Sequence, residues 1–139
     1  MGDQDKKTYS ISELAQEFGI STRTIRYYEE VGLINSHREK DTLPRMYTSR
    51  DRTRLKLTLR GKRFGFSLAE IKEMLDLYDV DPTEKEQLRR TIELGDKRIA
   101  EIDEMIRDLE EIKQEMLEFK QRFQEILKQK EGSVKEDKG

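Results

Sequence analysis

The feature that most constrains this chain is a long run of helix-forming sequence in its C-terminal part. Between Pro82 and Lys130 there is no further proline and only one glycine. Apolar residues recur in this run at alternating steps of four and three, which is the spacing of a coiled-coil seam. The helix would extend about 70 Å at 1.5 Å per residue, and a domain this small offers no surface long enough to cover its stripe. We therefore expect a coiled-coil helix over residues 82–130 that pairs with a second copy, rather than one packed on its own domain.

The predicted seam contains one irregularity. From Leu88 to Leu109 the steps alternate regularly, so the next seam residue should be Lys113, but Ile112 comes one residue earlier. This is a stammer, a local overwinding of the repeat. Gly95 also lies on the seam, and it either permits close helix approach or marks a weak point. The residues predicted to form the dimer interface are Leu88, Ile92, Ile99, Ile102, Ile106, Leu109, Ile112, Met116, Phe119 and Phe123.

A second pattern, from Ile11 to Leu33, indicates two short helices joined by a tight turn. Apolar residues at helical spacing give the first helix one apolar face. Gly19 is suited to the positive φ that ends a helix, and Ser21 is a good N-cap for the next one. This is the layout of a helix-turn-helix, whose second helix enters the major groove of DNA. The alternative is a helical hairpin that binds no nucleic acid.

The second helix of this pair carries hydrogen-bond donors suited to phosphates and base edges. These are Arg23, Arg26 and the adjacent Tyr27 and Tyr28. One face of the helix must pack inward, and aromatic residues are more often core than contact. We therefore expect Tyr28 to pack in the core and Tyr27 to reach the DNA backbone.

The net charge of -2 conceals an uneven distribution. Residues 1–63 carry a net charge of +5, and residues 64–139 carry -7. From Arg45 to Arg63, eight basic residues stand against one acid, Asp51. Like charges at short range repel one another unless a partner neutralises them, so the cluster indicates phosphate contact. The alternative is a solvated helix face.

The sequence after the helix-turn-helix predicts a wing and a further helix. The segment from His37 to Tyr47 contains Asp41 and Pro44, and we interpret it as a small hairpin. A helix is expected from about Thr48, whose hydroxyl can cap it while Asp51 lies three residues on.

This helix and the next one are bounded by glycines and by a second cap. The leucines in Leu55–Leu59 alternate as in a strand, but the density of basic residues favours a helix. Gly61 and Gly65 predict breaks in the chain around the intervening residues. Ser67 and Glu70 form a capping-box pattern, which predicts another helix immediately after them.

Composition excludes several functions. With no cysteine and a single histidine, His37, the chain lacks the residues for a disulfide or a transition-metal site. No phosphate loop, nucleophile elbow or metal motif is present, so we expect no cofactor and no enzymatic activity. No apolar run approaches the roughly 20 residues of a membrane span. Together with the missing secretory segment, this fits a cytoplasmic protein.

Three stretches of the chain resemble MerR-type transcription regulators: Tyr9–Ile34, Arg45–Tyr47 and Arg60–Met74. With the predicted coiled coil they account for nearly the whole chain. The stretch Asp51–Asp79 further resembles LiuR-like regulators of branched-chain amino acid and fatty acid breakdown. The metal-sensing branches of the family carry cysteines near the end of the coiled coil, and this chain has none.

The resemblance implies a mainly all-α fold, with a winged helix-turn-helix followed by a long helix that forms an antiparallel, two-fold coiled-coil homodimer. Such regulators bind promoter DNA at an inverted repeat and distort it so that RNA polymerase can start, usually when a small-molecule effector binds. The residues predicted to contact DNA are Thr22, Arg23, Arg26, Tyr27, His37, Arg45, Tyr47, Arg60, Lys62 and Arg63. The candidate effector site comprises Phe64, Phe66, Leu77 and Tyr78.

The predicted organisation has four parts. Residues 1–8 form a flexible arm, 9–79 the DNA-binding domain, 82–130 the dimerisation helix and 131–139 a disordered tail. The competing hypothesis is a coiled-coil adaptor that recruits a protein partner through its acidic helix.

Overall fold

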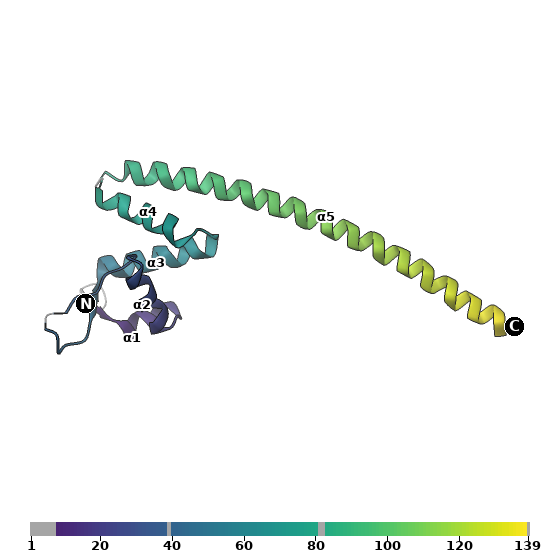
Figure 1. Cartoon of the computed structure of the whole chain (residues 1–139), viewed down its shortest axis with the longest axis horizontal. Helices are drawn as coiled ribbons and strands as arrows, with labels where there is room; N and C mark the ends of the chain where they lie inside the picture. Colours follow the sequence, from purple (N-terminus) through teal and green to yellow (C-terminus); the bar gives the residue numbers. More distant parts are fainter. Residues whose placement is uncertain (1–7, 39, 81–82, 139) are drawn as a thin grey trace, which may run out of the picture. The chain divides into compact units, whose positions relative to one another are not determined.

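The computed structural model describes residues 8–38, 40–80 and 83–138, without the side chains of Tyr78 and residues 134–138. Its elements are β1 (Thr8–Ser10), α1 (Ile11–Phe18), α2 (Thr22–Glu30), β2 (Met46–Thr48), α3 (Ser49–Phe64), α4 (Leu68–Val80) and α5 (Lys85–Lys138) (Figure 1). The predicted, mainly helical fold is confirmed. The chain divides into two compact units, residues 1–98 and 99–139, and the second consists of the C-terminal part of α5.

The helix-turn-helix forms as its local sequence signals predict. Ser10 caps α1 in a capping box with Glu13, each side chain accepting a hydrogen bond of 3.1 Å from the other residue's backbone nitrogen. Gly19 ends α1 with φ of 65°, a left-handed conformation that only glycine adopts freely. Ser21 then caps α2 by accepting a 3.0 Å hydrogen bond from the Thr24 nitrogen. These caps fix the turn between the two helices.

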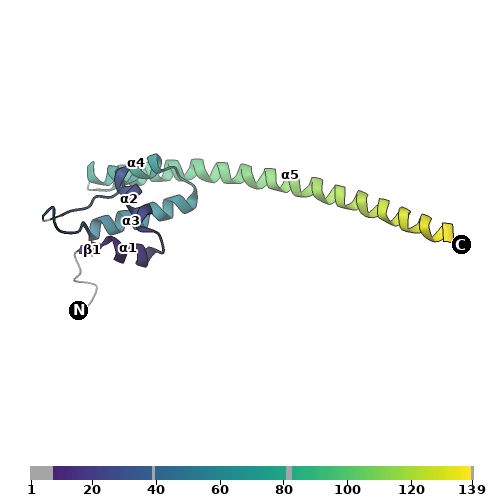
Figure 2. The ribbon, with the colours of Figure 1, turned by 60° about the horizontal axis from the view of Figure 1, so that its bottom comes forward.

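A short two-stranded sheet joins the N-terminal strand to the end of the wing. β1 pairs antiparallel with β2, and Tyr9 lies opposite Tyr47 (Figure 2 labels β1). Thr8 is predicted to belong to a flexible arm, but it forms part of this sheet. Residues 1–7 of the predicted arm lie outside the described residues. The predicted wing is closed by two backbone hydrogen bonds of 2.8 Å between His37 and Met46.

The segment with alternating leucines is a helix. Thr48 and Asp51 form the predicted capping box at the start of α3. The expected break at Gly61 is wrong, because α3 continues through it and ends at Phe64, before Gly65. Ile71 of α4 packs against Gly61 so closely that a Cβ there would lie 2.8 Å from its side chain. Gly61 thus allows α4 to pack closely against α3, and it does not form a turn.

One core holds this unit together. It is built from residues of α1, α2, the loop after α2, β2, α3 and α4, so each element contributes to the same apolar interior. The buried members are Leu14, Ile25, Tyr28, Leu33, Ile34, Tyr47, Leu55, Ile71 and Leu75.

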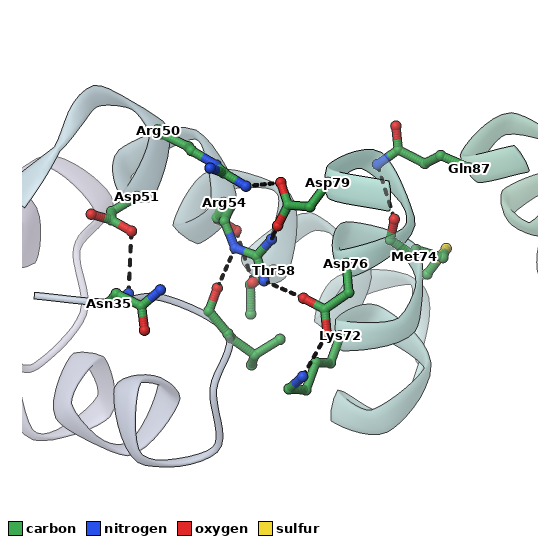
Figure 3. Close-up of polar contacts among 11 residues, drawn as sticks. Asn35, Arg50, Asp51, Arg54, Thr58, Lys72, Met74, Asp76, Asp79 and Gln87 are labelled. Atoms are coloured by element: carbon green, nitrogen blue, oxygen red, sulfur yellow. Dashed lines mark hydrogen bonds and ion pairs between the residues drawn. The ribbon is translucent and has the colours of Figure 1, made fainter. Parts of the chain in front are cut away.

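A polar network lies beside the core and joins α3 to α4 (Figure 3). Arg54 donates to the carbonyl of Leu33 (2.6 Å) and to Asp76 (3.0 Å). Its guanidinium also lies 3.7 Å from Asp79, which pairs with Arg50 as well. Burial alone would raise the pKa of Asp76, but hydrogen bonds from Lys72 and Arg54 lower it overall.

The start of α5 is tied to the preceding helices by three side-chain contacts. Gln87 donates to the carbonyl of Met74 (3.0 Å), Arg90 pairs with Glu73 (3.1 Å), and Arg98 donates to the carbonyl of Phe64 (2.8 Å). No helix in the described part of the chain is both long enough and apolar enough to cross a membrane.

The long helix extends beyond its predicted end. α5 runs to Lys138, whereas the sequence predicts a disordered tail from residue 131. The tail is rich in lysine and glutamate, which are good helix formers, and Gly132 costs only about 1 kcal/mol relative to alanine. An established helix can therefore propagate through it.

We expect Asp76→Asn to lower the stability of the fold at neutral pH, because it removes the charged acceptor for Arg54 and Lys72. The folded-state pKa of Asp76 is lowered, so its contribution is present above about pH 4, the usual pKa of aspartate. That contribution is lost as the pH falls through and below this value. Urea unfolding at pH 7 and at pH 2.5 measures the difference. Asp108→Asn, at an exposed site on α5, is the control, and a destabilisation by Asp76→Asn that is equal at both pH values would contradict this account.

Candidate nucleic-acid interface

The two faces of α2 are sharply divided. Ile25 and Tyr28 point into the core, and Tyr28 is 7% exposed. On the opposite face Tyr27 is 49% exposed, and Arg23 and Arg26 are exposed as well. The expectation that Tyr28 packs in the core is therefore confirmed, and the contact of the exposed Tyr27 with the DNA backbone stays a prediction. Neither arginine forms an ion pair or hydrogen bond with any residue in the described part of the chain.

The wing is fastened to α2 by Glu29. Arg45 donates to one carboxylate oxygen of Glu29 (2.6 Å), and the Tyr47 hydroxyl donates to the other (2.9 Å). Tyr47 is 1% exposed, and burial together with the hydrogen bond to Glu29 raises its pKa. Tyr47 therefore supports the wing from inside the protein, and its predicted contact with DNA stays a prediction. Glu29 is not among the residues predicted from the sequence to form the site, because its partners lie 16 and 18 residues away.

Half of the basic cluster is neutralised within the protein. Arg45 pairs with Glu29, and Arg52 pairs with Glu17 while its guanidinium lies 5.6 Å from the centre of the Tyr9 ring. As described above, Arg50 and Arg54 pair with the acids of α4. The acids involved lie outside the cluster in sequence, so counting charges along Arg45–Arg63 overestimates the charge available to an external polyanion.

The other half of the cluster is exposed. Lys56, Arg60, Lys62 and Arg63 have no ion pair with any residue that the structure describes. The last three occupy the C-terminal end of α3, before the turn into α4. They are therefore available to an external polyanion, and their contact with phosphates stays a prediction.

The remaining predicted DNA contacts lie on α2 and on the wing. Thr22 is the first residue of α2 and is half-buried. His37 is exposed at the base of the wing, with its Nε2 3.7 Å from a carboxylate oxygen of Asp51. The structure thus joins α2 and the wing through Glu29, and it places Arg60, Lys62 and Arg63 at the opposite end of α3 from the wing.

Two of the four predicted effector residues line an apolar cavity of about 280 Å³. Phe64 and Phe66 line it, Leu77 is absent from its walls, and the side chain of Tyr78 lies outside the described residues. The other residues lining it are Leu57, Arg60, Gly61, Ile71, Met74, Leu75, Gln87, Leu88 and Thr91. No cluster of three or more potential metal ligands occurs among the residues described.

The sequence matches two family profiles, the MerR HTH family regulatory protein over residues 9–77 and MerR, DNA binding over residues 52–119. The HTH-type transcriptional activator mta of Bacillus subtilis is 36% identical over 70% of this chain. This chain spans 37% of that relative's length. The mercuric resistance operon regulatory protein of Bacillus cereus is 34% identical over 61% of this chain and 73% of its own length.

The fold is also similar to a solved structure described as HiNmlR, a MerR family regulator lacking the sensor domain, bound to promoter DNA. The two share 32% sequence identity with a TM-score of 0.56, over 74% of this chain and 79% of that chain. The two family profiles, the relatives and the solved structure all indicate the same family of DNA-binding regulators, which is consistent with the exposed arginines on α2. This chain belongs to the MerR family of transcription regulators.

Proposed function

We propose that this chain regulates transcription by binding promoter DNA as a homodimer. The observation that carries the proposal is the exposed face of α2, where Arg23 and Arg26 form no ion pair or hydrogen bond with any described residue and Tyr27 is exposed beside them. Arginine side chains in this position can donate two hydrogen bonds to a guanine edge in the major groove. A family member of similar fold is described as bound to promoter DNA, which supports DNA binding by this chain.

The remaining DNA contacts are proposed to come from both ends of α3. The wing, held by Glu29, and the basic residues Arg60, Lys62 and Arg63 contact phosphates and fix the position of α2 on the duplex. Contacts at separated places allow the protein to bend its site. Such bending costs of order 1–6 kcal/mol and is offset by the added contacts, so the dimer can realign promoter elements for RNA polymerase.

Dimerisation is proposed to occur through α5. Its seam residues are uncovered in the single chain, and Leu109, in the middle of the seam, is 65% exposed. An apolar stripe of this length is not stable in water by itself. A two-fold dimer presents two copies of α2, which match the two halves of an inverted repeat.

An apolar metabolite is proposed as the effector. The cavity beside Phe64 and Phe66 is lined mostly by apolar side chains, with Arg60 at its wall as a donor for an anionic group. An acyl-type molecule has both properties and agrees with the LiuR-like resemblance. The cavity lies against α3, so its occupancy can alter the basic end of that helix.

The competing function, an adaptor that recruits a protein through its acidic helix, is favoured by the net charge of -7 over residues 64–139. A gel-shift titration separates the two functions. The regulator shifts an inverted-repeat promoter fragment more strongly than random duplex, with an affinity that falls as salt rises. An adaptor leaves both duplexes unshifted at micromolar protein.

Arg26→Ala is expected to weaken binding to the operator by about 1–3 kcal/mol and to reduce discrimination against random DNA. Arg26 forms no hydrogen bond or ion pair with any described residue, so its loss is expected to remove a contact with DNA without disturbing the fold. Operator affinities measured at several salt concentrations test this. Arg107→Ala, another exposed arginine that lies on α5, is the matched control and should bind normally. Equal losses in the two variants would exclude a specific role for Arg26.

Tyr47→Phe tests whether the hydrogen bond to Glu29 holds the wing against α2. Loss of the hydroxyl removes a hydrogen bond to Glu29, and we expect a loss of stability of about 0.5–1.5 kcal/mol. Operator affinity should fall while its salt dependence stays unchanged, because no phosphate contact is lost. Unfolding curves and binding isotherms provide the two measurements. A changed salt dependence would mean that the hydroxyl itself contacts phosphate.

Leu109→Glu is expected to convert the dimer to monomer, because it places a charge in the apolar seam. Sedimentation at several protein concentrations measures this change. Leu117→Glu, also exposed on α5 but off the seam, is the control and should remain dimeric. A dimer that persists in Leu109→Glu would refute the proposed interface.

A further inference from the structure

The apolar seam of α5 is symmetric about Leu109. In both directions along the helix, the seam residues stand 3, 7, 10, 14 and 17 positions from Leu109. The stammer between Leu109 and Ile112 is therefore the point at which the repeat reverses. The residues at equal distances form the pairs Ile106 and Ile112, Ile102 and Met116, Ile99 and Phe119, Gly95 and Phe123, and Ile92 and Ile126.

This symmetry determines which residues meet in an antiparallel pair of helices. An irregular step in one seam leaves the two seams out of phase unless the partner has the same step at the same level. In an antiparallel pair this requires the two copies of Leu109 to lie opposite each other. Each seam residue then faces the member of its own pair on the second copy.

We propose that the backbone at Gly95 receives the side chain of Phe123 from a second copy of this chain, with the two-fold axis at Leu109. The inference rests on the proposed dimer and specifies its register. Gly95 lies inside α5, where a glycine is destabilising, and a Cβ added there would meet nothing within 4 Å among the residues that the structure describes. The single chain therefore gives no steric reason for glycine at this position.

Phe123 supplies the complementary volume. Its side chain is 61% exposed and stacks on Phe119 with ring centroids 6.1 Å apart. A phenyl ring opposite a residue without a side chain keeps the layer close to normal packing density. A parallel pair would instead place Gly95 against Gly95 and Phe123 against Phe123, which leaves one layer empty and another crowded.

The charges beside the seam fit the same register. Asp96 and Asp103 each follow a seam residue in the N-terminal half of α5, and Lys113 and Lys120 each follow one in the C-terminal half. The four side chains therefore lie on one flank of the helix, and all are exposed without an ion pair to any described residue. The antiparallel register brings Asp103 near Lys113 and Asp96 near Lys120 of the second copy. Flanking pairs of this kind set the orientation of coiled-coil helices.

Cysteine cross-linking tests the axis, because the chain has no cysteine of its own. Leu109→Cys is expected to give a covalent dimer on mild oxidation, since its two copies meet at the axis. Ile102→Cys is the control. Its two copies would lie 14 residues apart along the helix, about 21 Å at 1.5 Å per residue, so no covalent dimer is expected.

Sedimentation of the unmodified chain tests the dimer separately from its antiparallel register. A monomer would overturn both the proposed dimer and its register. A dimer in which Ile102→Cys cross-links as readily as Leu109→Cys would overturn the antiparallel register alone. A dimer in which Leu109→Cys fails to cross-link would also overturn the register, and the proposed function would stand.

Size exchange tests the seating of Phe123. Gly95→Leu is expected to weaken dimerisation about tenfold or more, because it overpacks the layer. Adding Phe123→Ala should relieve the clash, so the double variant dimerises more tightly than Gly95→Leu alone. Gly132→Leu, at the other glycine of α5, is the matched control and should dimerise normally. Additive losses in the double variant, with helix content unchanged by circular dichroism, would show that the two residues do not meet.

Discussion

The N-terminal unit depends on the neutralisation of its own arginines. Arg54 has little exposed surface and is held by the carbonyl of Leu33 and by Asp76 and Asp79 of α4. A buried guanidinium without these partners would cost far more than an exposed one. This requirement fixes α4 against α3 and fixes the loop after α2 against both. Because Leu33 lies in the loop directly after α2, the hydrogen bond from Arg54 ties the end of α2 to α3 and α4.

Local signals in the sequence predicted most of the fold. Capping residues such as Ser10 and Thr48 define helix starts through contacts three residues away, so they can be recognised without tertiary information. Helical periodicity likewise predicts that Tyr28 is buried and that Tyr27, the preceding residue, lies on the exposed face. The predicted break at Gly61 is wrong because this position is small to admit the side chain of Ile71, which comes from another helix.

The candidate site was harder to predict because its charges are paired over long sequence distances. Arg52 meets Glu17, and Arg45 meets Glu29, from elements that sequence alone does not place side by side. A count of basic residues therefore could not separate the arginines that stabilise the fold from those left exposed. The assignment of Tyr47 to DNA contact comes from the family resemblance, and the sequence gives no sign of its hydrogen bond to Glu29, which lies 18 residues away.

The hydrogen bonds from Arg45 and Tyr47 to Glu29 limit how the DNA sequence preference of this protein could be altered by design. One carboxylate accepts from both a wing guanidinium and a buried phenol, so α2 and the wing behave as a single rigid reader. Transplanting a foreign second helix that lacks an acceptor at this position would leave the Tyr47 hydroxyl unsatisfied in the interior. A design that changes the DNA sequence preference would therefore have to replace α2 and the wing together, so that positions 29, 45 and 47 remain matched.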